Sequence, residues 1–246
     1  MVNMFIDKKI KFCIPKGSLQ PDTLMEFEKA GYQLKGYNTD SRYYRPWIND
    51  EEIELKVLRP QEIPLYVEQR SYDVGITGHD WVLETDYPYG CLQEVEEILD
   101  LKYGKVRIVL AVPSQWEDIN SFEDLENMGK REIRISTEYI NISSKFILKK
   151  TGSEPSIFTP WHTKRRGHIK LYLSFGATEG KPPEDAEAIL DNTSSTRTII
   201  ENGLKVIETV LHSSARLIVN KYSLKDTWKR EKISEIVEAF NSIKKS

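Results

Sequence analysis

The sequence predicts an α/β fold of two lobes, each with a mixed β-sheet. Three observations lead to this prediction. Short apolar segments alternate along the chain with capped or amphipathic helical segments, the order from which parallel and mixed sheets are built. With 246 residues, the chain has room for one large domain or two small ones. It contains no internal repeat and no Pro/Gly/Ser-rich linker, so a second lobe must be inserted through strands that cross between lobes.

The expected strands are short and either alternating or continuously apolar. In chain order they cover residues 9–14, 53–58, 72–76, 106–112, 133–136, 169–175, 188–191, 204–211 and 215–220. The segment 53–58 alternates apolar and charged residues, as a half-exposed strand does. The segment 106–112 is apolar throughout, which is typical of a strand covered on both faces.

Helix signals fall between these strands. The expected helices cover about 21–29, 61–69, 80–84, 121–127 and 142–150, with a helical turn at 182–186 and a closing helix at 225–245. Pro21 suits a first helical turn, where its missing N–H costs nothing. Gly31 is placed to end that helix, and Ser121 is placed to cap another.

The longest apolar strands, around Arg107 and around Val206, are the candidates for the crossings between lobes. We therefore expect lobe I to contain residues 1–105 and 206–246, and lobe II to contain residues 106–205. Ligands commonly settle between two such lobes, so the active site is expected in the interlobe cleft.

Composition excludes several classes of protein. A net charge of −3 gives no general attraction to nucleic acid or to an anionic membrane. No segment approaches the roughly 20 apolar residues of a membrane span, and no secretory N-terminus is visible, so we expect a cytoplasmic protein. Cys13 and Cys91 form no disulfide framework. The four histidines lack metal-ligand spacing, and no metal-binding residue is assigned.

The segment 188–203 is the most informative stretch. Asp191 stands where a strand runs into a loop, and a short helix follows that Gly203 ends. Five hydroxyl side chains crowd the start of this helix, namely Thr193, Ser194, Ser195, Thr196 and Thr198. Free N–H groups with nearby hydroxyls can hold a phosphate, and a carboxylate can accept hydrogen bonds from ribose hydroxyls. A phosphorylated ribose therefore fits this segment, although Ser, Thr and Asp are also simply the preferred helix caps.

Cations stand at several strand ends. Lys16 and Arg59 each follow an expected strand, and Lys105 and Arg107 lie where the chain is expected to cross between lobes. Because strand ends converge on one rim of a parallel sheet, these four cations would suit a polyphosphate or a pyrophosphate leaving group. The alternative for each is an ordinary ion pair with one of the many acidic residues.

Several ungapped motifs, in the right order, together resemble ATP phosphoribosyltransferase, the first enzyme of histidine biosynthesis. They lie at 16–17, 41–46, 58–64, 73–81, 101–105, 176–179, 191–204 and 213–220. The resemblance implies a fold akin to periplasmic binding proteins. It also implies a reaction that joins N1 of ATP to C1 of phosphoribosyl pyrophosphate, with Mg²⁺ on the diphosphate, giving N1-(5-phosphoribosyl)-ATP and pyrophosphate.

The resemblance also implies roles for particular residues and an oligomer built from dimers. The expected contacts of phosphoribosyl pyrophosphate are Asp191, Thr193, Ser194, Ser195, Thr196, Arg197 and Thr198. The expected contacts of ATP are Gly17, Thr77, Gly78, Asp80, Tyr103 and Lys105. Our hypothesis is that Lys16 and Arg59 stabilise the negative charge that develops on the leaving pyrophosphate.

The chain departs from the family pattern in three places. Thr196 stands where the family usually has glycine, which raises the question of backbone strain. The sequence near Trp228 looks like the long form of the family, which continues into a histidine-binding regulatory domain, whereas this sequence ends at Ser246. Feedback by histidine is therefore not expected unless a separate regulatory subunit supplies it. Residues 152–168 form an insertion whose role the sequence leaves open between an interface, a lid and decoration.

Two alternatives stay open at this point. One is a related transferase that acts on another nitrogen base. The other is a noncatalytic nucleotide-binding partner subunit that uses the same fold without chemistry.

Overall fold

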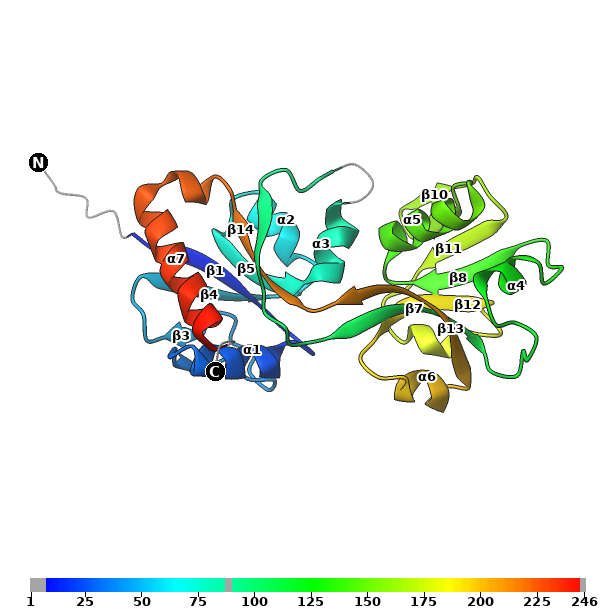
Figure 1. Ribbon diagram of the computed structural model, residues 1–246, viewed down its shortest axis with the longest axis horizontal. Coiled ribbons are helices and arrows are strands. Elements are labelled where there is room, and N and C mark those ends of the chain that lie inside the picture. Colours follow the sequence, from blue (N-terminus) through cyan, green and yellow to red (C-terminus); the bar gives the residue numbers. More distant parts are fainter. Residues whose placement is uncertain (1–7, 87–89, 244–246) are drawn as a thin grey trace, which may run out of the picture. The chain divides into compact units, whose positions relative to one another are not determined.

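The computed structural model describes residues 8–86 and 90–243, and they form two compact units (Figure 1). Unit 1 contains Met1–Thr85, Cys91–Gly104 and Ser214–Ser246, and unit 2 contains Asp86–Gly90 and Lys105–Ser213. The predicted α/β class with mixed sheets and two lobes is confirmed. No helix within the described ranges is long and apolar enough to cross a membrane.

Unit 1 is built on a five-stranded sheet in the order β4-β1-β5-β14-β6. The strands are β1 (Ile10–Pro15), β4 (Ile53–Leu58), β5 (Val74–Gly78), β6 (Val95–Asp100) and β14 (Ala215–Asn220). Strands β4, β1 and β5 are parallel to one another, and β14 runs antiparallel between β5 and β6. Parallel strands end at the same edge, so the loops after β1, β4 and β5 are neighbours.

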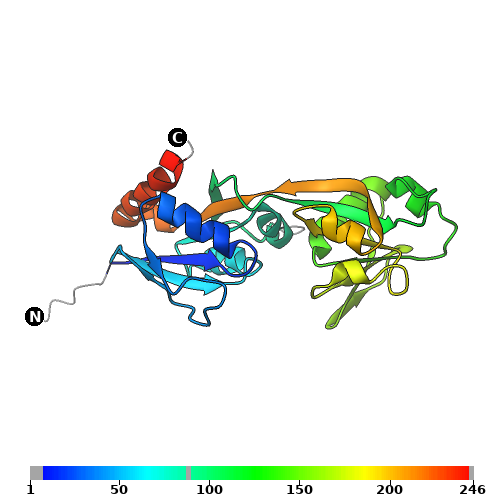
Figure 2. The same ribbon diagram turned by 90° about the horizontal axis from the view of Figure 1, so that it is seen from below.

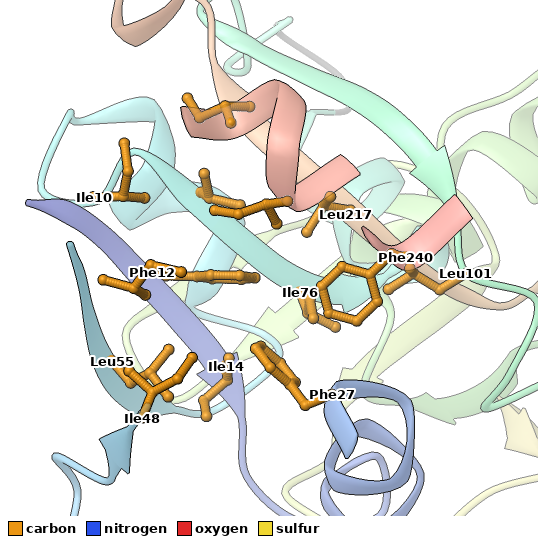
Figure 3. Close-up of a cluster of buried hydrophobic side chains, with 14 of the residues drawn as sticks. Ile10, Phe12, Ile14, Phe27, Ile48, Leu55, Ile76, Leu101, Leu217 and Phe240 are labelled. Atoms are coloured by element: carbon orange, nitrogen blue, oxygen red, sulfur yellow. The ribbon is translucent and has the colours of Figure 1, made fainter. Parts of the chain in front are cut away.

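Helices cover both faces of this sheet (Figures 1 and 2). Phe12 packs in a core with α1 (Gln20–Lys29) and α7 (Thr227–Ser242), whose Phe27 and Phe240 rings meet edge to face at 5.1 Å (Figure 3). The next residue, Cys13, points to the opposite face and packs against α2 (Ile63–Glu68) and α3 (His79–Asp86). Successive strand side chains alternate between faces, which explains the near-continuous apolar sequence of β1.

Unit 2 contains a seven-stranded sheet in the order β10-β9-β11-β8-β12-β7-β13. The strands are β7 (Val106–Pro113), β8 (Ile133–Thr137), β9 (Ser156–Thr159), β10 (His162–Lys164), β11 (Ile169–Leu173), β12 (Ala188–Thr193) and β13 (Leu204–Ser213). Strands β9, β11, β8 and β12 are parallel neighbours. Their carboxyl ends therefore form one rim, which we call the unit 2 rim.

Among the described residues, unit 2 contains three complete α-helices. In α4 (Phe122–Glu126), the Ser121 hydroxyl accepts the backbone N–H of Asp124 at 3.1 Å, which confirms the predicted cap. The following helix, α5 (Ile140–Thr151), meets α4 through an edge-to-face contact of Phe122 and Phe146 at 5.4 Å. Helix α6 (Arg197–Glu201) packs through Ile199 on Ala111 and Ile189.

Some predicted elements differ from the structure. The helical turn expected at 182–186 is present as a single turn at 182–185, where the Asp185 N–H donates to the Lys181 carbonyl at 2.9 Å, and it follows the 3-10 turn η1 (Thr178–Gly180), which was not predicted. A second 3-10 turn is η2 (Ser223–Lys225). Strands β6, β9 and β10 were not predicted, nor was the small pair β2 (Leu34–Lys35) and β3 (Trp47–Ile48). The insertion at 152–168 contains the β9–β10 hairpin.

The connections between units that follow β6 and β13 lie outside the long strands that were expected to cross. Strand β13 pairs with β7 along its length, with two register shifts, and both strands belong to unit 2. Besides the boundaries at Thr85/Asp86 and Gly90/Cys91, the division between units falls at Gly104/Lys105 and at Ser213/Ser214. Residues 206–213 are thus part of unit 2, although the sequence placed them in lobe I.

Candidate active site

In unit 1, the ends of β1 and β4 form a pocket of about 260 Å³, which we call the cationic pocket. Its lining comprises Lys16, Tyr44, Lys56, Val57, Leu58, Arg59 and Glu62. The strands are parallel neighbours, and the Lys16 N–H donates to the Leu58 carbonyl at 2.7 Å. This pairing brings together Lys16 and Arg59, the two residues expected to stabilise pyrophosphate.

Tyr44 organises the cations of this pocket. Its hydroxyl accepts a hydrogen bond from Lys16 Nζ at 3.0 Å, and the Lys16 and Lys56 ammonium groups lie 4.5 and 5.8 Å from its ring centre. The hydrogen bond from Lys16, together with its charge, lowers the pKa of Tyr44. No ion pair of Lys16, Lys56 or Arg59 occurs within residues 8–86 and 90–243, so the pocket keeps positive charge for an anion.

The sequence did not single out Tyr44 and Lys56 as site residues. Lys56 is an alternating charge within β4, which looks like an ordinary solvated position. Tyr44 belongs to the motif 41–46 that carried the family resemblance, and this motif was the available signal.

The residues expected to contact ATP are dispersed through unit 1 and the start of unit 2, and none lines the cationic pocket. Thr77 is buried and donates its hydroxyl to the Pro60 carbonyl at 2.7 Å. Asp80 is also buried, in the first turn of α3. Gly17 forms the turn after Lys16 with a φ of +90°, a conformation that favours glycine. The ATP contacts remain a prediction.

Tyr103 and Lys105 flank the first connection between units. The Tyr103 hydroxyl shares a hydrogen bond of 2.8 Å with Thr23, and burial raises the pKa of Tyr103. Between them, Gly104 has a φ of +59°, and an added Cβ would lie 2.2 Å from Leu19 Cδ2. The chain therefore requires glycine at position 104, because a side chain there would be strained and would clash with Leu19. Lys105 is exposed and, with Arg107, belongs to unit 2.

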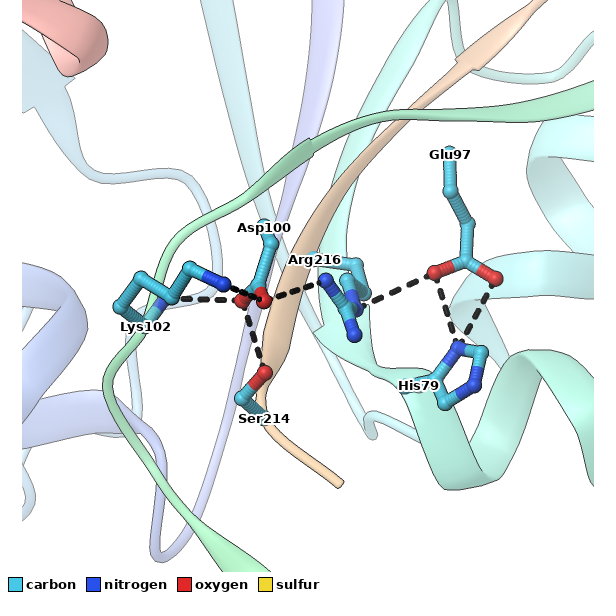
Figure 4. A network of polar contacts seen from close by, with 6 residues as sticks. All are labelled: His79, Glu97, Asp100, Lys102, Ser214 and Arg216. Atoms are coloured by element: carbon cyan, nitrogen blue, oxygen red, sulfur yellow. Dashed lines mark hydrogen bonds and ion pairs between the residues drawn. The ribbon is translucent and has the colours of Figure 1, made fainter. Parts of the chain in front are cut away.

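A polar network beside this connection ties β6 to β14 within unit 1 (Figure 4). Asp100 accepts hydrogen bonds from the Ser214 hydroxyl at 2.7 Å and from the Lys102 N–H at 3.0 Å, and it pairs with Arg216 Nη1 at 2.7 Å. Arg216 also pairs with Glu97, which contacts His79 Nδ1 at 2.9 Å. Burial alone would raise the pKa of Asp100, but bonds from Lys102 and Ser214 hold it well below its usual range.

In unit 2, the end of β12 borders a second pocket, of about 150 Å³, which we call the hydroxyl pocket. Its lining comprises Glu179, Ile189, Asp191, Asn192, Thr193, Ser194, Thr198 and Ile199. Four of the residues expected to hold phosphoribosyl pyrophosphate thus line one cavity: Asp191, Thr193, Ser194 and Thr198.

Two carboxylates, Asp191 and Glu179, line the hydroxyl pocket, and a third, Glu138, interacts with both. Burial raises the pKa of Asp191, against a hydrogen bond from Thr178, and the Glu179 charge raises it further. Burial also raises the pKa of Glu138, which follows β8, with the charges of Asp191 and Glu179 adding to the effect. Negative charge collected in a partly buried place favours hydroxyl donors and positive charge. Glu138 and Glu179 were not among the predicted site residues, although Glu179 ends the motif 176–179.

The remaining loop residues do not line the hydroxyl pocket. The Ser195 carbonyl accepts the Thr193 hydroxyl, and Arg197 pairs with Glu201 at 2.7 Å on the exposed side of α6. Thr196 has a φ of −72° and a ψ of −4°. This right-handed conformation suits a β-branched residue, so the strain expected of threonine in place of glycine does not arise.

Metal-ligating side chains do not cluster in the described ranges. Residues 8–86 and 90–243 contain no group of three or more His, Cys, Asp or Glu side chains that could hold a metal ion. Cys13 is buried, and its thiol contacts the Val74 carbonyl at 3.4 Å. Burial raises the pKa of this thiol and so keeps it protonated, the unreactive form.

The sequence is similar to a known family. The family model described as ATP phosphoribosyltransferase matches residues 59–242. A curated ATP phosphoribosyltransferase of Thermodesulfovibrio yellowstonii is 40% identical over 235 residues, which cover 94% of this chain and 70% of the relative. One of Chlorobaculum parvum is 40% identical over 232 residues, covering 92% of this chain and 69% of the relative.

This chain belongs to the ATP phosphoribosyltransferase family. The predicted family is thereby confirmed, as are the enzyme class, a transferase, and the pathway step, the first of histidine biosynthesis. These matches support the main prediction over the two alternatives, a transferase for another base and a noncatalytic partner.

Solved structures agree on the fold of this family member. A chain titled as the ATP phosphoribosyl transferase (HisG:HisZ) complex from Thermotoga maritima has a TM-score of 0.71 at 22% identity, covering 95% of this chain and 98% of that one. The periplasmic aliphatic sulphonate binding protein SsuA from Escherichia coli has a TM-score of 0.55 at 11% identity, covering 96% and 72%. The expected likeness to periplasmic binding proteins is confirmed.

Proposed function

We propose that the two pockets serve one reaction, the transfer of the phosphoribosyl group to N1 of ATP. The observation that carries this proposal is the hydroxyl pocket, where a partly buried carboxylate stands beside a loop of hydroxyls. In the proposal, Asp191 and Glu179 accept hydrogen bonds from the ribose hydroxyls. Thr193, Ser194 and Thr198, with Ser195, Thr196 and Arg197 of the same loop, surround the 5-phosphate.

The charges of the pockets match the charges that develop in the reaction. Breaking the bond between C1 and the pyrophosphate oxygen builds positive charge on the ribose ring and negative charge on the leaving group. The carboxylates of the hydroxyl pocket would stabilise the positive charge on the ribose ring. Lys16, Lys56 and Arg59 would stabilise the negative charge on the pyrophosphate. Tyr44 holds Lys16 in place through its hydrogen bond. Adenine N1 already has a lone pair, so correct placement of the base supplies much of the catalysis.

Magnesium enters this proposal on the diphosphate of the donor, where it adds positive charge to the leaving group. Lys16, Lys56 and Arg59 of the cationic pocket do not ligate a metal, so in the proposal they bind phosphate oxygens beside the ion, while the Glu62 carboxylate accepts the Arg59 N–H at 3.3 Å. We also propose that the chain forms an oligomer built from dimers. The HisG:HisZ title of the Thermotoga maritima structure names a second component, and we propose a separate regulatory subunit here as well.

The test is pyrophosphate release from phosphoribosyl pyrophosphate in the presence of Mg²⁺ and ATP, compared with other purines. We expect pyrophosphate release when ATP is the acceptor and none when another purine takes its place. Arg59→Ala should lower kcat about a hundredfold, since loss of one stabilising donor typically costs that much. Lys35→Ala is the control, because it also removes a cation of unit 1, but Lys35 lies over the Trp47 ring and does not line the cationic pocket. A kcat for Arg59→Ala within threefold of the unaltered chain would contradict the assigned role.

A further inference from the structure

Two exposed aromatic side chains lie on the unit 2 rim. Phe175 and Trp161 are 74% and 72% exposed, the highest values for large hydrophobic side chains in the described ranges. Their rings meet at 6.3 Å in an edge-to-face arrangement. Contiguous solvent-exposed aromatic rings are typical of a binding surface for a ligand, a protein or a membrane.

The topology places this pair close to the hydroxyl pocket. Trp161 follows β9, Phe175 follows β11 and Asp191 lies near the end of β12, and these are parallel strands of one sheet with only β8 between β11 and β12. Neighbouring strands are about 4.8 Å apart, so β11 and β12 are separated by about 10 Å.

A chain of hydrogen bonds connects Phe175 to the pocket. The Thr178 hydroxyl is hydrogen-bonded to Asp191, and its oxygen lies 3.1 Å from the Ser174 hydroxyl oxygen, within hydrogen-bond distance. Ser174 immediately precedes Phe175, and its N–H donates to the Thr137 carbonyl at 2.8 Å. The turn then continues through Gly176 and Ala177 with positive φ values of 100° and 49°. The loop that presents Phe175 is therefore fixed to the residue proposed to hold the ribose.

We propose that Trp161 and Phe175 form the stacking surface for the adenine ring of ATP. This inference rests on the proposed function, since the base must meet C1 of a ribose held at Asp191. A flat heterocycle covers aromatic rings well, and two side chains are too small an area for a stable protein interface.

The experiment compares steady-state constants for both substrates. Phe175→Ala and Trp161→Ala should each raise KM for ATP about tenfold through lost stacking, with KM for phosphoribosyl pyrophosphate changed less than twofold. Phe175→Trp should restore ATP binding, whereas Phe175→Leu, which fills space without stacking, should behave like alanine. Trp47→Ala is the control, since Trp47 is 49% exposed and belongs to unit 1.

Fluorescence supplies a readout that does not depend on turnover. ATP should change the emission of the unaltered chain, and Trp161→Phe should abolish most of that change while leaving KM for ATP within about twofold. An unchanged KM for ATP in both alanine variants, or equal increases for both substrates, would overturn the inference. An ATP-dependent emission change in a chain that releases no pyrophosphate would instead overturn the proposed function and leave the stacking surface standing.

Discussion

At the scale of single residues, Asp191 is expected to lower the stability of the folded chain and, in the proposed function, to bind ribose hydroxyls. Burial and the Glu179 charge raise its pKa, so its ionised form is disfavoured in the folded chain. A carboxylate whose folded pKa is raised above the unfolded value destabilises the folded state at pH values above that folded pKa. Hydrogen bonds from ribose hydroxyls would stabilise the ionised form of such a carboxylate.

We therefore predict opposite effects of Asp191→Asn on stability and on binding. The free energy of unfolding at pH 7 should stay unchanged or rise, because the amide carries no charge. The affinity for phosphoribosyl pyrophosphate should fall at least about tenfold, the scale of one hydrogen bond to a charged group. Chemical denaturation and calorimetric titration measure the two quantities. Asp118→Asn, at an exposed aspartate of unit 2, should change neither.

Thr196 provides a second prediction at this scale. Its helical φ of −72° needs no glycine, so Thr196→Gly should alter the affinity for phosphoribosyl pyrophosphate by less than about threefold. The substitution should lower the free energy of unfolding by up to about 1 kcal/mol, since glycine loses more backbone entropy on folding. A gain in affinity of a hundredfold would show that the native loop is impaired.

At the scale of elements, a buried carboxylate joins the start of β8 to the approach to β12. Glu187 is 3% exposed at its side chain and pairs with Arg134 and Lys130, each at 2.9 Å. Burial opposes its ionisation, but hydrogen bonds from Arg134 and Lys130 lower the pKa of Glu187 from 4.5 to about 2. Its stabilisation is thus complete above pH 4.5 and is lost as the pH falls toward 2.

Glu187→Gln should therefore destabilise the chain in a pH-dependent way. We expect a loss of about 3 kcal/mol at pH 7, where two cations lose their buried partner. The difference from the unaltered chain should shrink as the pH falls from 4.5 toward 2. Urea denaturation at pH 7 and pH 3 measures it. Glu201→Gln, which removes the exposed partner of Arg197, should show no such dependence. An equal difference at both pH values would contradict the assignment.

Elements with a strong local signal were predictable from sequence, and those that depend on tertiary pairing were not. The alternation at 53–58 predicted β4 with its observed bounds, and Ser121 capped α4 as expected. Strand β6 was not predicted because Val95–Asp100 mixes charged and apolar residues without alternation. Its β-structure depends on pairing with β14, which is distant in the sequence. The single turn at 182–185 was also predictable, because its two prolines favour turns and first helical positions.

At the scale of the whole molecule, the site could be predicted in part. The strand-end motifs led to Lys16, Arg59 and Asp191, since strand ends converge by topology alone. Tyr44, Lys56, Glu138 and Glu179 come from loops and a strand whose proximity depends on three-dimensional packing. Tyr44 and Glu179 belong to motifs that carried the family resemblance, whereas no local pattern distinguishes Lys56 or Glu138 from solvated residues.

The division of charge between the two pockets predicts different effects on two ligands. Because the proposal assigns the 5-phosphate and ribose to unit 2 and the diphosphate to unit 1, Lys16→Ala should weaken binding of phosphoribosyl pyrophosphate about tenfold or more. The same variant should bind ribose 5-phosphate as tightly as the unaltered chain. Competitive titration with both ligands measures the effect. Equal weakening for the two ligands would show that the assignment to separate pockets is wrong.

The position of β14 has a consequence for the order in which the chain matures. This strand lies between β5 and β6 in the sheet of unit 1, yet it follows all of unit 2 in the sequence. During synthesis, β5 and β6 therefore leave the ribosome with unpaired edges, and α7 arrives later still. Unit 2 is a nearly continuous segment that can complete its own sheet first. The half that is synthesised first is thus the half that folds last, and its exposed edges are where a chaperone would be needed.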